Sequence, residues 1–492
     1  MQHDGVSELA FSSAVELLER LDRRELGSRE LLDLCLSRVE EHDEAINAVV
    51  ALDADAACAA AAAVDDARAR SEEVGPLAGL PLTIKDAFEV VGMTATCGLP
   101  TLAQHRPERD ADTVHRLREA GAVIFGKTNV PAGVSDWQSY NELFGVTRNP
   151  WNSERTVGGS SGGSAASIAS GFAALELGSD IAGSIRVPSH FCGVFGHKPS
   201  YGIVPVRGHI PPPPGGLLAV PLGVAGPIAR SAADLELALE LLSGPNELEA
   251  TGWRLELPPS RHERLADFRV GLWLGGGAYR VDGAYAEAVR GFAASLERAG
   301  ARVSEVEPPF DPDEIRDLFL RTLFGIVGAT EPGAAEAMLA LAADDATGYA
   351  SRLGRAMASS LGEWFGTLAR REHLFRAFRA FFADHDVLLC PVVPSVAFPH
   401  DTAEGGPHAG QLYRRIVVDG ERVPYFDNFA WPGLATCANL PSTVMPTGRF
   451  VDGLPAGVQI VGPYLEDRTT LRFARLAEAV TGGFVPPPAL SR

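Results

Sequence analysis

VGGSSGGSAA, residues 157–166, and GSDIAGSIRVP, residues 178–188, are the two stretches that decide the fold of this chain. Glycine permits positive φ and close backbone approach, so such turns can aim several backbone N–H groups at one point. That geometry binds an anion, either a phosphate or the oxyanion that develops during acyl transfer. A serine in such a turn can act as a nucleophile if a base lies near it. One Gly/Ser turn alone is usually only a turn, but two of them around a predicted helix and strand indicate a site.

The distribution of lysine points to the same region. Of the 43 lysine and arginine residues, only three are lysines, namely Lys85, Lys127 and Lys198. All three fall between residues 75 and 205. Arginine keeps its proton in proteins, whereas a buried lysine can lose it. Lys85 ends the apolar run GLPLTIK and is therefore a candidate base. From the count alone, codon bias with three accidental lysines is an equally good explanation.

The pattern of apolar residues predicts an α/β fold. Apolar runs at 80–84, 122–125 and 173–177 alternate with helical patterns at 113–120 and 164–172. Such alternation is typical of a sheet with helices packed against it.

Outside this region the same reasoning predicts further elements. At the N-terminus, Ser13 and Glu16 match a helix capping box, a second helical pattern begins at Ser28, and a third covers 56–68. Further helices are predicted at 232–243 and within 311–384, and strands at 270–274, 303–306, 387–390 and 458–461. The proline-rich segment 209–216 can be neither helix nor central strand, so we expect a stiff surface loop, with the rim of a pocket as the alternative.

Composition and charge exclude several classes of protein. The chain has 492 residues, of which 46% are hydrophobic and 22% charged, as in ordinary globular proteins. A net charge of −20 argues against general nucleic-acid binding. No secretory signal and no run of 18 apolar residues is present, so we expect a cytoplasmic protein with no membrane partner. The six cysteines are dispersed without a CxxC pair, which predicts reduced thiols, and no metal or cofactor is expected.

One motif suggests a nucleotide-binding site, but the predicted local structure does not fit such a site. GAVIFGKT, residues 121–128, matches the GxxxxGK[ST] phosphate-loop pattern. Such a loop needs flexible residues between its glycines, whereas Val123, Ile124 and Phe125 are themselves the predicted strand. We therefore expect Lys127 and Lys198 to support the site or the fold.

Together these residues resemble the amidase signature family. The resemblance is close over about 75–230 and looser up to the end of the chain. Similar family segments match residues 79–86, 126–129, 147–151, 191–193, 390–391 and 453–462. It implies a large central mixed β-sheet covered by helices on both faces, with a helical middle lobe, in one amidase domain spanning 1–492. Its expected parts are an N-terminal helical arm (1–70), the signature core (71–245), a more variable lobe (246–384) and a return to the sheet (385–492).

The resemblance also implies a Ser–cis-Ser–Lys triad. Residue by residue, the nucleophile falls on Ser184, the proton relay on Ser160 with a cis peptide bond after Gly159, and the base on Lys85. The backbone N–H groups of Ile181, Ala182, Gly183 and Ser184 would form the oxyanion hole. Free lysine is only about 0.1% neutral near pH 7.4, so burial must lower the pKa of Lys85.

Three positions depart from the family pattern. Ala182 replaces a common glycine in the oxyanion turn, and a methyl group there need not block an N–H donor. Glu176 and His190 stand where small residues are usual. They mark either an altered pocket wall or local packing, and none of these changes removes a triad member.

The resemblance implies a hydrolase that cleaves the C–N bond of a small amide, with carbamate or ester cleavage as close variants. If aromatic residues such as Trp137, Tyr140, Phe319 and Trp364 line the cleft, the substrate is apolar or aromatic. One alternative is the ammonia-supplying A-type component of a multi-protein glutamine amidotransferase, although the nearest match to a segment usual in that branch, TLARRE at 367–372, lacks its pattern. Another is a non-catalytic binding protein on the same fold. We expect a monomer or homodimer.

Overall fold

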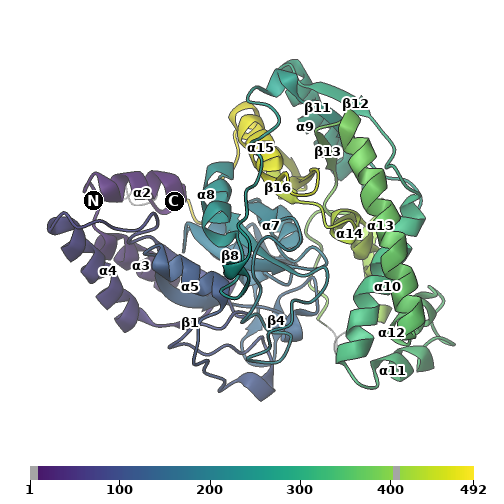
Figure 1. Cartoon of the computed structure of the whole chain (residues 1–492), viewed down its shortest axis with the longest axis horizontal. Helices are drawn as coiled ribbons and strands as arrows, with labels where there is room; N and C mark the ends of the chain where they lie inside the picture. Colours follow the sequence, from purple (N-terminus) through teal and green to yellow (C-terminus); the bar gives the residue numbers. More distant parts are fainter. Residues whose placement is uncertain (1–8, 403–409, 492) are drawn as a thin grey trace.

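An 11-stranded mixed sheet runs through the structure of the chain, a computed structural model that describes residues 9–402 and 410–491. Its strand order is β1-β3-β2-β8-β10-β9-β16-β17-β13-β11-β12, and Figure 1 shows the helices arranged around it. The strands are β1 (Val49–Leu52), β2 (Pro81–Lys85), β3 (Val123–Thr128), β8 (Leu175–Asp180), β9 (Phe195–Lys198), β10 (Val224–Ala229), β11 (Arg269–Leu272), β12 (Arg302–Glu305), β13 (Val387–Cys390), β16 (Ser442–Val451) and β17 (Leu454–Val461). The predicted large mixed sheet is confirmed.

Strand direction in this sheet places the two signature turns beside the end of β2. Strand β2 is parallel to both β3 and β8, whereas β10, β9, β16 and β17 follow in antiparallel pairs. In the β2–β8 register, Leu82 lies opposite Leu175 and Ile84 opposite Leu177. Lys85 therefore ends its strand next to the end of β8, at the carboxyl edge where α/β sheets usually bind ligands.

Helices cover both faces of the sheet, as expected. On one face, α8 (Ala232–Leu242), α9 (Gly283–Arg298) and α15 (Asp467–Thr481) contact the strands, and α5 (Asp112–Glu119) packs on α8. On the other, α6 (Gly162–Ala169) and α7 (Arg186–Cys192) contact the strands and each other. Alternation along β2 separates the faces, because Leu82 and Ile84 join the core under α8 and α9 while Thr83 and Lys85 point to the α6 side.

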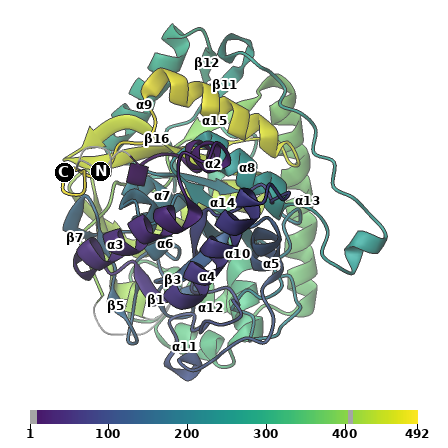
Figure 2. The same cartoon turned by 90° about the vertical axis from the view of Figure 1, so that its left-hand side faces the viewer.

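The N-terminal helices form where the sequence predicts them. They are α2 (Ala14–Asp22), α3 (Ser28–Ile46) and α4 (Ala54–Ala69). The capping box of Ser13 and Glu16 is present, and Ala14, Leu17, Leu18 and Leu21 are buried on one face of α2. Figures 1 and 2 show these helices on the side of the molecule opposite the α10–α13 lobe. Residues 1–8 of the predicted arm lie outside the described residues.

A helical middle lobe is also present, over a shorter range than the predicted 246–384, because β11, α9 and β12 in the first half of that range belong to the sheet and its helical layer. It consists of α10 (Pro312–Thr330), α11 (Ala334–Ala340), α12 (Tyr349–Met357) and α13 (Leu361–Asp384), and α10 packs on α14 (Ala430–Cys437). Its buried apolar side chains share one core cluster with Trp137 and Ala182. The lobe therefore continues into the neighbourhood of the second signature turn.

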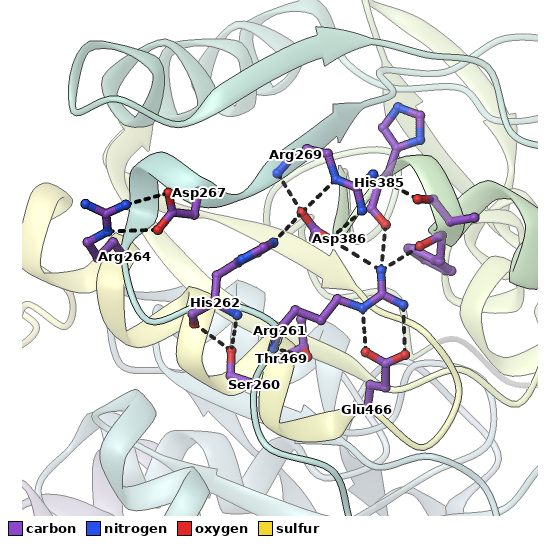
Figure 3. Close-up of polar contacts among 12 residues, drawn as sticks. Ser260, Arg261, His262, Arg264, Asp267, Arg269, His385, Asp386, Glu466 and Thr469 are labelled. Atoms are coloured by element: carbon purple, nitrogen blue, oxygen red, sulfur yellow. Dashed lines mark hydrogen bonds and ion pairs between the residues drawn. The ribbon is translucent and has the colours of Figure 1, made fainter.

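A polar cluster fastens the irregular segment 245–268 to the sheet (Figure 3). The buried Asp386 carboxylate accepts hydrogen bonds from the backbone and guanidinium of Arg269 and from His262. Arg261 bridges from Asp386 to Glu466, to which it donates two hydrogen bonds of 2.5 and 2.8 Å. These contacts join segments that are distant in the sequence.

The remaining elements are short. They are the strands β4 (Tyr140–Asn141), β5 (Gly145–Val146), β6 (Arg148–Asn149), β7 (Asn152–Thr156), β14 (Arg415–Val418) and β15 (Glu421–Pro424), and the 3-10 turns η1 (Pro100–Leu102), η2 (Ala132–Val134), η3 (Glu249–Thr251), η4 (Leu265–Asp267), η5 (Gly410–Tyr413) and η6 (Tyr425–Phe429). Strands β1, β9, β10 and β16 were not predicted from the sequence. All six cysteines are free. Among the described residues, no helix is long and apolar enough to cross a lipid bilayer.

Candidate active site

Lys85 lies at the centre of a cage of hydroxyl groups. Its side chain is fully buried, and its Nζ lies 2.7 Å from Ser160 Oγ, 3.0 Å from Ser161 Oγ and 2.9 Å from Ser179 Oγ. Burial lowers the pKa of Lys85 to about 7, against the opposing influence of nearby acidic groups. The amine is therefore held in a place where its neutral form is accessible near neutral pH.

Ser160 is presented by the turn that begins α6. The Gly159–Ser160 peptide bond is cis, as the resemblance implies. A Cβ on Gly159 would lie 2.3 Å from the Asp136 carbonyl, so this close approach requires glycine. The Ser161 N–H donates to the Ser184 carbonyl at 3.0 Å, which fastens the first signature turn to the second. The structure thus brings together Lys85, Ser160 and Ser184.

A buried ion pair braces the second turn. Asp180, at the end of β8, accepts hydrogen bonds from the Arg186 guanidinium at 2.8 and 2.9 Å. Its carboxylate also accepts from the backbone N–H groups of Gly183 and Ile185 at 2.8 and 3.1 Å. Burial alone would raise the pKa of Asp180, but Arg186 lowers it to about 2, so the carboxylate stays charged. The pair fixes the backbone that carries Ser184.

The predicted oxyanion turn has one N–H fewer to offer than expected. The Gly183 N–H donates to Asp180, whereas the N–H groups of Ile181, Ala182 and Ser184 have no acceptor among the described residues. Gly183 has φ of +99°, which favours glycine, and Trp137 Nε1 donates to the Ala182 carbonyl at 2.9 Å. These three N–H groups are therefore the remaining hydrogen-bond donors of the turn.

Glu176 supports the helix that follows Ser160 and does not form a pocket wall. It is 1% exposed, accepts from Thr83, and accepts from Thr128 at 2.7 Å. These two threonines in turn contact Ser167 and Ser164 on α6 at 3.2 and 2.9 Å. Burial raises the pKa of Glu176 to about 7. The carboxyl group thus links β2, β3 and β8 to the underside of α6.

His190 is likewise a packing residue. Its Nδ1 accepts from the Gly457 N–H at 2.7 Å, and its Nε2 lies 3.2 Å from the Ser395 carbonyl. The ring stacks on Tyr285 with centroids 4.8 Å apart. Burial lowers the pKa of His190 to about 4, so the imidazole is neutral at neutral pH. Of the two interpretations for Glu176 and His190, local packing is the one that the structure supports.

The other two lysines serve the fold. Lys127 lies in β3, pairs with Asp86 at 3.1 Å, and donates to the carbonyls of Phe88 and Thr94. Its segment is a strand, as predicted, which leaves no flexible phosphate loop. Lys198 donates to the Pro199 carbonyl at 2.9 Å. Within residues 9–402 and 410–491, no group of three or more His, Cys, Asp or Glu side chains is placed to hold a metal ion.

Three side chains at this site were not predicted from the sequence. Ser161 and Ser179 belong to the quoted motifs, but no role was assigned to them. His209 begins the proline-rich loop, and its Nε2 lies 2.8 Å from Ser179 Oγ. The start of the loop 209–216 therefore borders the site, whereas Pro211, Pro213 and Gly215 are exposed, as expected for a surface loop. The signal in the sequence is a histidine shortly before four prolines.

Comparisons with known proteins agree with the fold. The family model described as Amidase matches residues 30–471. The A subunit of the glutamyl-tRNA(Gln) amidotransferase of Synechococcus sp. (strain CC9605) is 33% identical, with 96% of each chain covered. One similar structure is described as a vestigial protein complex that reveals the evolutionary origins of an s-triazine catabolic enzyme. It has a TM-score of 0.80 at 29% identity, and the match covers 97% of this chain and 100% of the other chain. A bacterial aryl acylamidase of the amidase signature family has a TM-score of 0.78 at 25% identity, covering 96% of each chain.

The fold, the site and these relatives define an amide-cleaving hydrolase. The chain belongs to the amidase signature family, as the resemblance implied.

Proposed function

We propose that this protein hydrolyses a carboxamide through an acyl-enzyme on Ser184, with Ser160 as the proton relay and Lys85 as the base. The observation that carries the proposal is the buried Lys85 amine, held 2.7 Å from Ser160 Oγ beside the turn of Ser184. A lysine can serve as a general base only when neutral, and a pKa of about 7 meets that requirement.

The reaction follows from these positions. Ser184 Oγ attacks the carbonyl carbon while its proton passes to Ser160, whose own proton passes to Lys85. The oxyanion receives hydrogen bonds from the N–H groups of Ile181, Ala182 and Ser184, each worth about 3 kcal/mol in the transition state. The C–N bond then breaks as Lys85 returns a proton through Ser160 to the leaving nitrogen. Water attacks the acyl-enzyme by the same relay and releases the carboxylic acid.

Two substrate classes are supported by different observations, and the first is an apolar or aromatic amide. Apolar side chains surround the oxyanion turn, since Trp137 contacts it and packs on Phe429 with ring centroids 4.3 Å apart. Pro432 also lies close to Gly183. This environment supports an apolar or aromatic amide. Carbamates and esters present a similar carbonyl and are included as variants.

The second class is glutamine, and the curated relatives favour it more than the first. The A-type amidotransferase alternative matches the name of relatives such as those of Synechococcus and Acidothermus cellulolyticus, both 33% identical. In that case the amide is glutamine, the product is ammonia, and the chain works within a multi-protein complex. The apolar surface beside the oxyanion turn weighs against a polar substrate, so the two substrates must be separated by experiment.

A turnover panel tests both parts of the proposal. Wild-type protein is assayed on anilides, aliphatic amides, carbamates, esters and glutamine, with Ser184→Ala, Ser160→Ala and Lys85→Ala as matched controls. Each control should lose about 10³-fold or more of the turnover. Retention of turnover in Ser184→Ala would refute the acyl-enzyme. Turnover of glutamine only, or only with co-expressed partner proteins, would establish the amidotransferase alternative, and turnover of anilides by the isolated chain would establish the small-amide one.

A further inference from the structure

His209 is held rigidly beside the lysine cage. The Glu89 N–H donates to the Gly208 carbonyl at 2.8 Å, and the Ile210 N–H donates to the Ala87 carbonyl at 2.7 Å. The residues around His209 are therefore paired with the segment that directly follows Lys85. The imidazole also packs edge-on against the buried Phe88, with ring centroids 4.9 Å apart.

The hydrogen-bond partners of His209 define which ring nitrogen carries the proton. Nδ1 lies 2.9 Å from the Pro211 carbonyl, which can only accept, so Nδ1 must donate. Burial and the nearby Lys85 lower the pKa of His209 to about 4, so the ring is neutral near pH 7 and Nε2 is an acceptor. The Ser179 hydroxyl, 2.8 Å from Nε2, must then donate its hydrogen to His209.

This assignment continues to the Lys85 amine. Ser179 has given its hydrogen to His209, so toward Lys85 it can only accept. Ser161 donates to the Ser179 carbonyl at 3.3 Å, so its hydroxyl can also only accept from Lys85. A neutral amine has two N–H groups and one lone pair. With both N–H groups directed to Ser161 and Ser179, the lone pair is left for the hydroxyl of Ser160.

We propose that His209 is a positioning residue which, by accepting the Ser179 hydroxyl hydrogen, directs the lone pair of Lys85 toward Ser160. His209 acts through Ser179 and touches no reacting atom. The inference rests on the proposed function, because it specifies how the base of that reaction is oriented. It also gives a role to the start of the loop 209–216.

Other titratable groups near Lys85 are the same in wild type and in every variant, and Glu176, whose pKa burial raises to about 7, titrates within the tested range in all of them. Asp180 and Glu176 face the lysine from β8, and the Cys97 thiol faces it from the segment after β2. Burial raises the pKa of Cys97 to about 12, so the thiol is neutral over the working range of pH. Replacing a neutral His209 therefore alters hydrogen bonding and leaves the local charge unchanged.

The test compares a substitution that removes the hydrogen-bond acceptor at position 209 with one that keeps an acceptor there. His209→Phe keeps a ring for Phe88 but removes the acceptor, whereas His209→Gln places an amide oxygen near the position of Nε2. His115→Phe, on the exposed surface of α5, is the control for the His-to-Phe exchange itself. The measurement is kcat/KM against pH from 5 to 9 on the best substrate of the panel, with folding checked by thermal melting.

In His209→Phe, the freed Ser179 hydroxyl should donate to the lone pair of neutral Lys85. This occupies the base, so kcat/KM on the alkaline plateau should fall about 10-fold. It also stabilises the neutral amine, so the midpoint of the acid limb should move to lower pH. His209→Gln should restore both to within about 3-fold of wild type, and His115→Phe should match wild type.

The outcomes separate this inference from the proposed function. A wild-type profile in His209→Phe, or a lower rate with an unmoved midpoint that glutamine does not rescue, overturns the role of His209. If His209→Phe does not fold, Ser179→Ala leaves the loop intact and should itself move the midpoint to lower pH, and an unmoved midpoint overturns the role. If Lys85→Ala and Ser184→Ala also keep full turnover, the proposed function fails as well.

Discussion

A lysine amine accepts a proton only after it has lost its own, and the surroundings of Lys85 favour that loss. The side chain is fully buried, and three serine hydroxyls replace the water that would otherwise solvate the charge. A buried ammonium is costly, which is why its pKa falls to about 7. Burial would not turn an arginine at this position into a base, because arginine keeps its proton in proteins.

The pH dependence of turnover follows from this pKa. Protonated Lys85 is inactive, so kcat/KM should rise with pH and level off above the pKa of about 7. At pH 5 the rate should be about 100-fold below the plateau, because only about 1% of the lysine is then neutral. The check is a pH–rate profile from 5 to 9 with chemistry rate-limiting. A flat profile over that range contradicts the lysine base.

At the residue scale, the sequence predicted which three residues come together but not their surroundings. Lys85, Ser160 and Ser184 lie in recognisable motifs, and the structure brings them together. The participation of His209 depends on a loop that folds back on Phe88, and no local pattern encodes that contact. The use of the Gly183 N–H by Asp180 likewise depends on a turn that only the folded chain defines.

At the scale of the element, the turn between β8 and α7 has strict backbone requirements. A Cβ on Gly183 would lie 2.8 Å from Pro432 and 2.8 Å from Val187, in a residue whose φ of +99° already excludes most side chains. Ala182 already tolerates its methyl group in the same turn. A substitution at Gly183 should therefore disturb the backbone of this turn, whereas a substitution at the adjacent Ala182 should not.

Gly183→Ala should displace the N–H groups that we propose as oxyanion donors and lower kcat about 100-fold or more. Ala182→Gly should keep kcat within about 3-fold of wild type. Steady-state kinetics on the two variants, with circular dichroism to confirm folding, provide the measurement. Equal losses in both variants would argue against the proposed oxyanion turn.

The raised pKa of Glu176 leads to a separate prediction about the stability of the contact between β8 and α6. Its folded pKa of about 7 lies above the ordinary value of 4.5, so the native state binds this proton more tightly than the unfolded state. The resulting stability is complete below pH 4.5 and is lost as pH rises through 7. Relative to Glu176→Gln, wild type should lose about 2–3 kcal/mol of unfolding free energy between pH 5 and 8. Urea denaturation at both values of pH measures the difference, and parallel changes in the two proteins would contradict it.

The elements differ in how well the sequence predicted them. Helices α2, α3 and α8 carry amphipathic or capping signals and were predicted within a few residues. Strands β10 and β16 were missed because each contains proline and glycine, which local rules assign to turns. Each of these strands forms in the sheet through pairing with strands such as β9 that lie elsewhere in the sequence, and local rules do not include such pairing.

At the scale of the whole molecule, strands from residues 71–245, 246–384 and 385–492 pair within one sheet. This supports our proposal that the chain folds as one amidase domain with the helical lobe inserted between β12 and β13. The sequence predicted the lobe from its apolar helices but not the tie that joins 260–269 to β13 and α15.

Asp386 is at the centre of this polar cluster, and replacing Asp386 tests how much the cluster stabilises the fold. Burial would raise the pKa of Asp386, but hydrogen bonds from Arg269 lower it to about 2, against an ordinary value of 3.8. The pairing is therefore present above pH 3.8 and is lost as pH falls through 2. Asp386→Asn should lower the unfolding free energy at pH 7 by about 2 kcal/mol without changing kcat. Thermal melting and kinetics check this, and a wild-type melting temperature would contradict it.

The central claim, that Ser184 is the acylated nucleophile activated by Lys85, is tested most directly by a fluorophosphonate probe with peptide mapping by mass spectrometry. Wild-type protein should gain one adduct, located on Ser184, at a rate that rises with pH through about 7. Ser184→Ala should gain none, and Lys85→Ala should react at least about 100-fold more slowly. An adduct on another residue, or equal labelling of Ser184→Ala, would contradict the account.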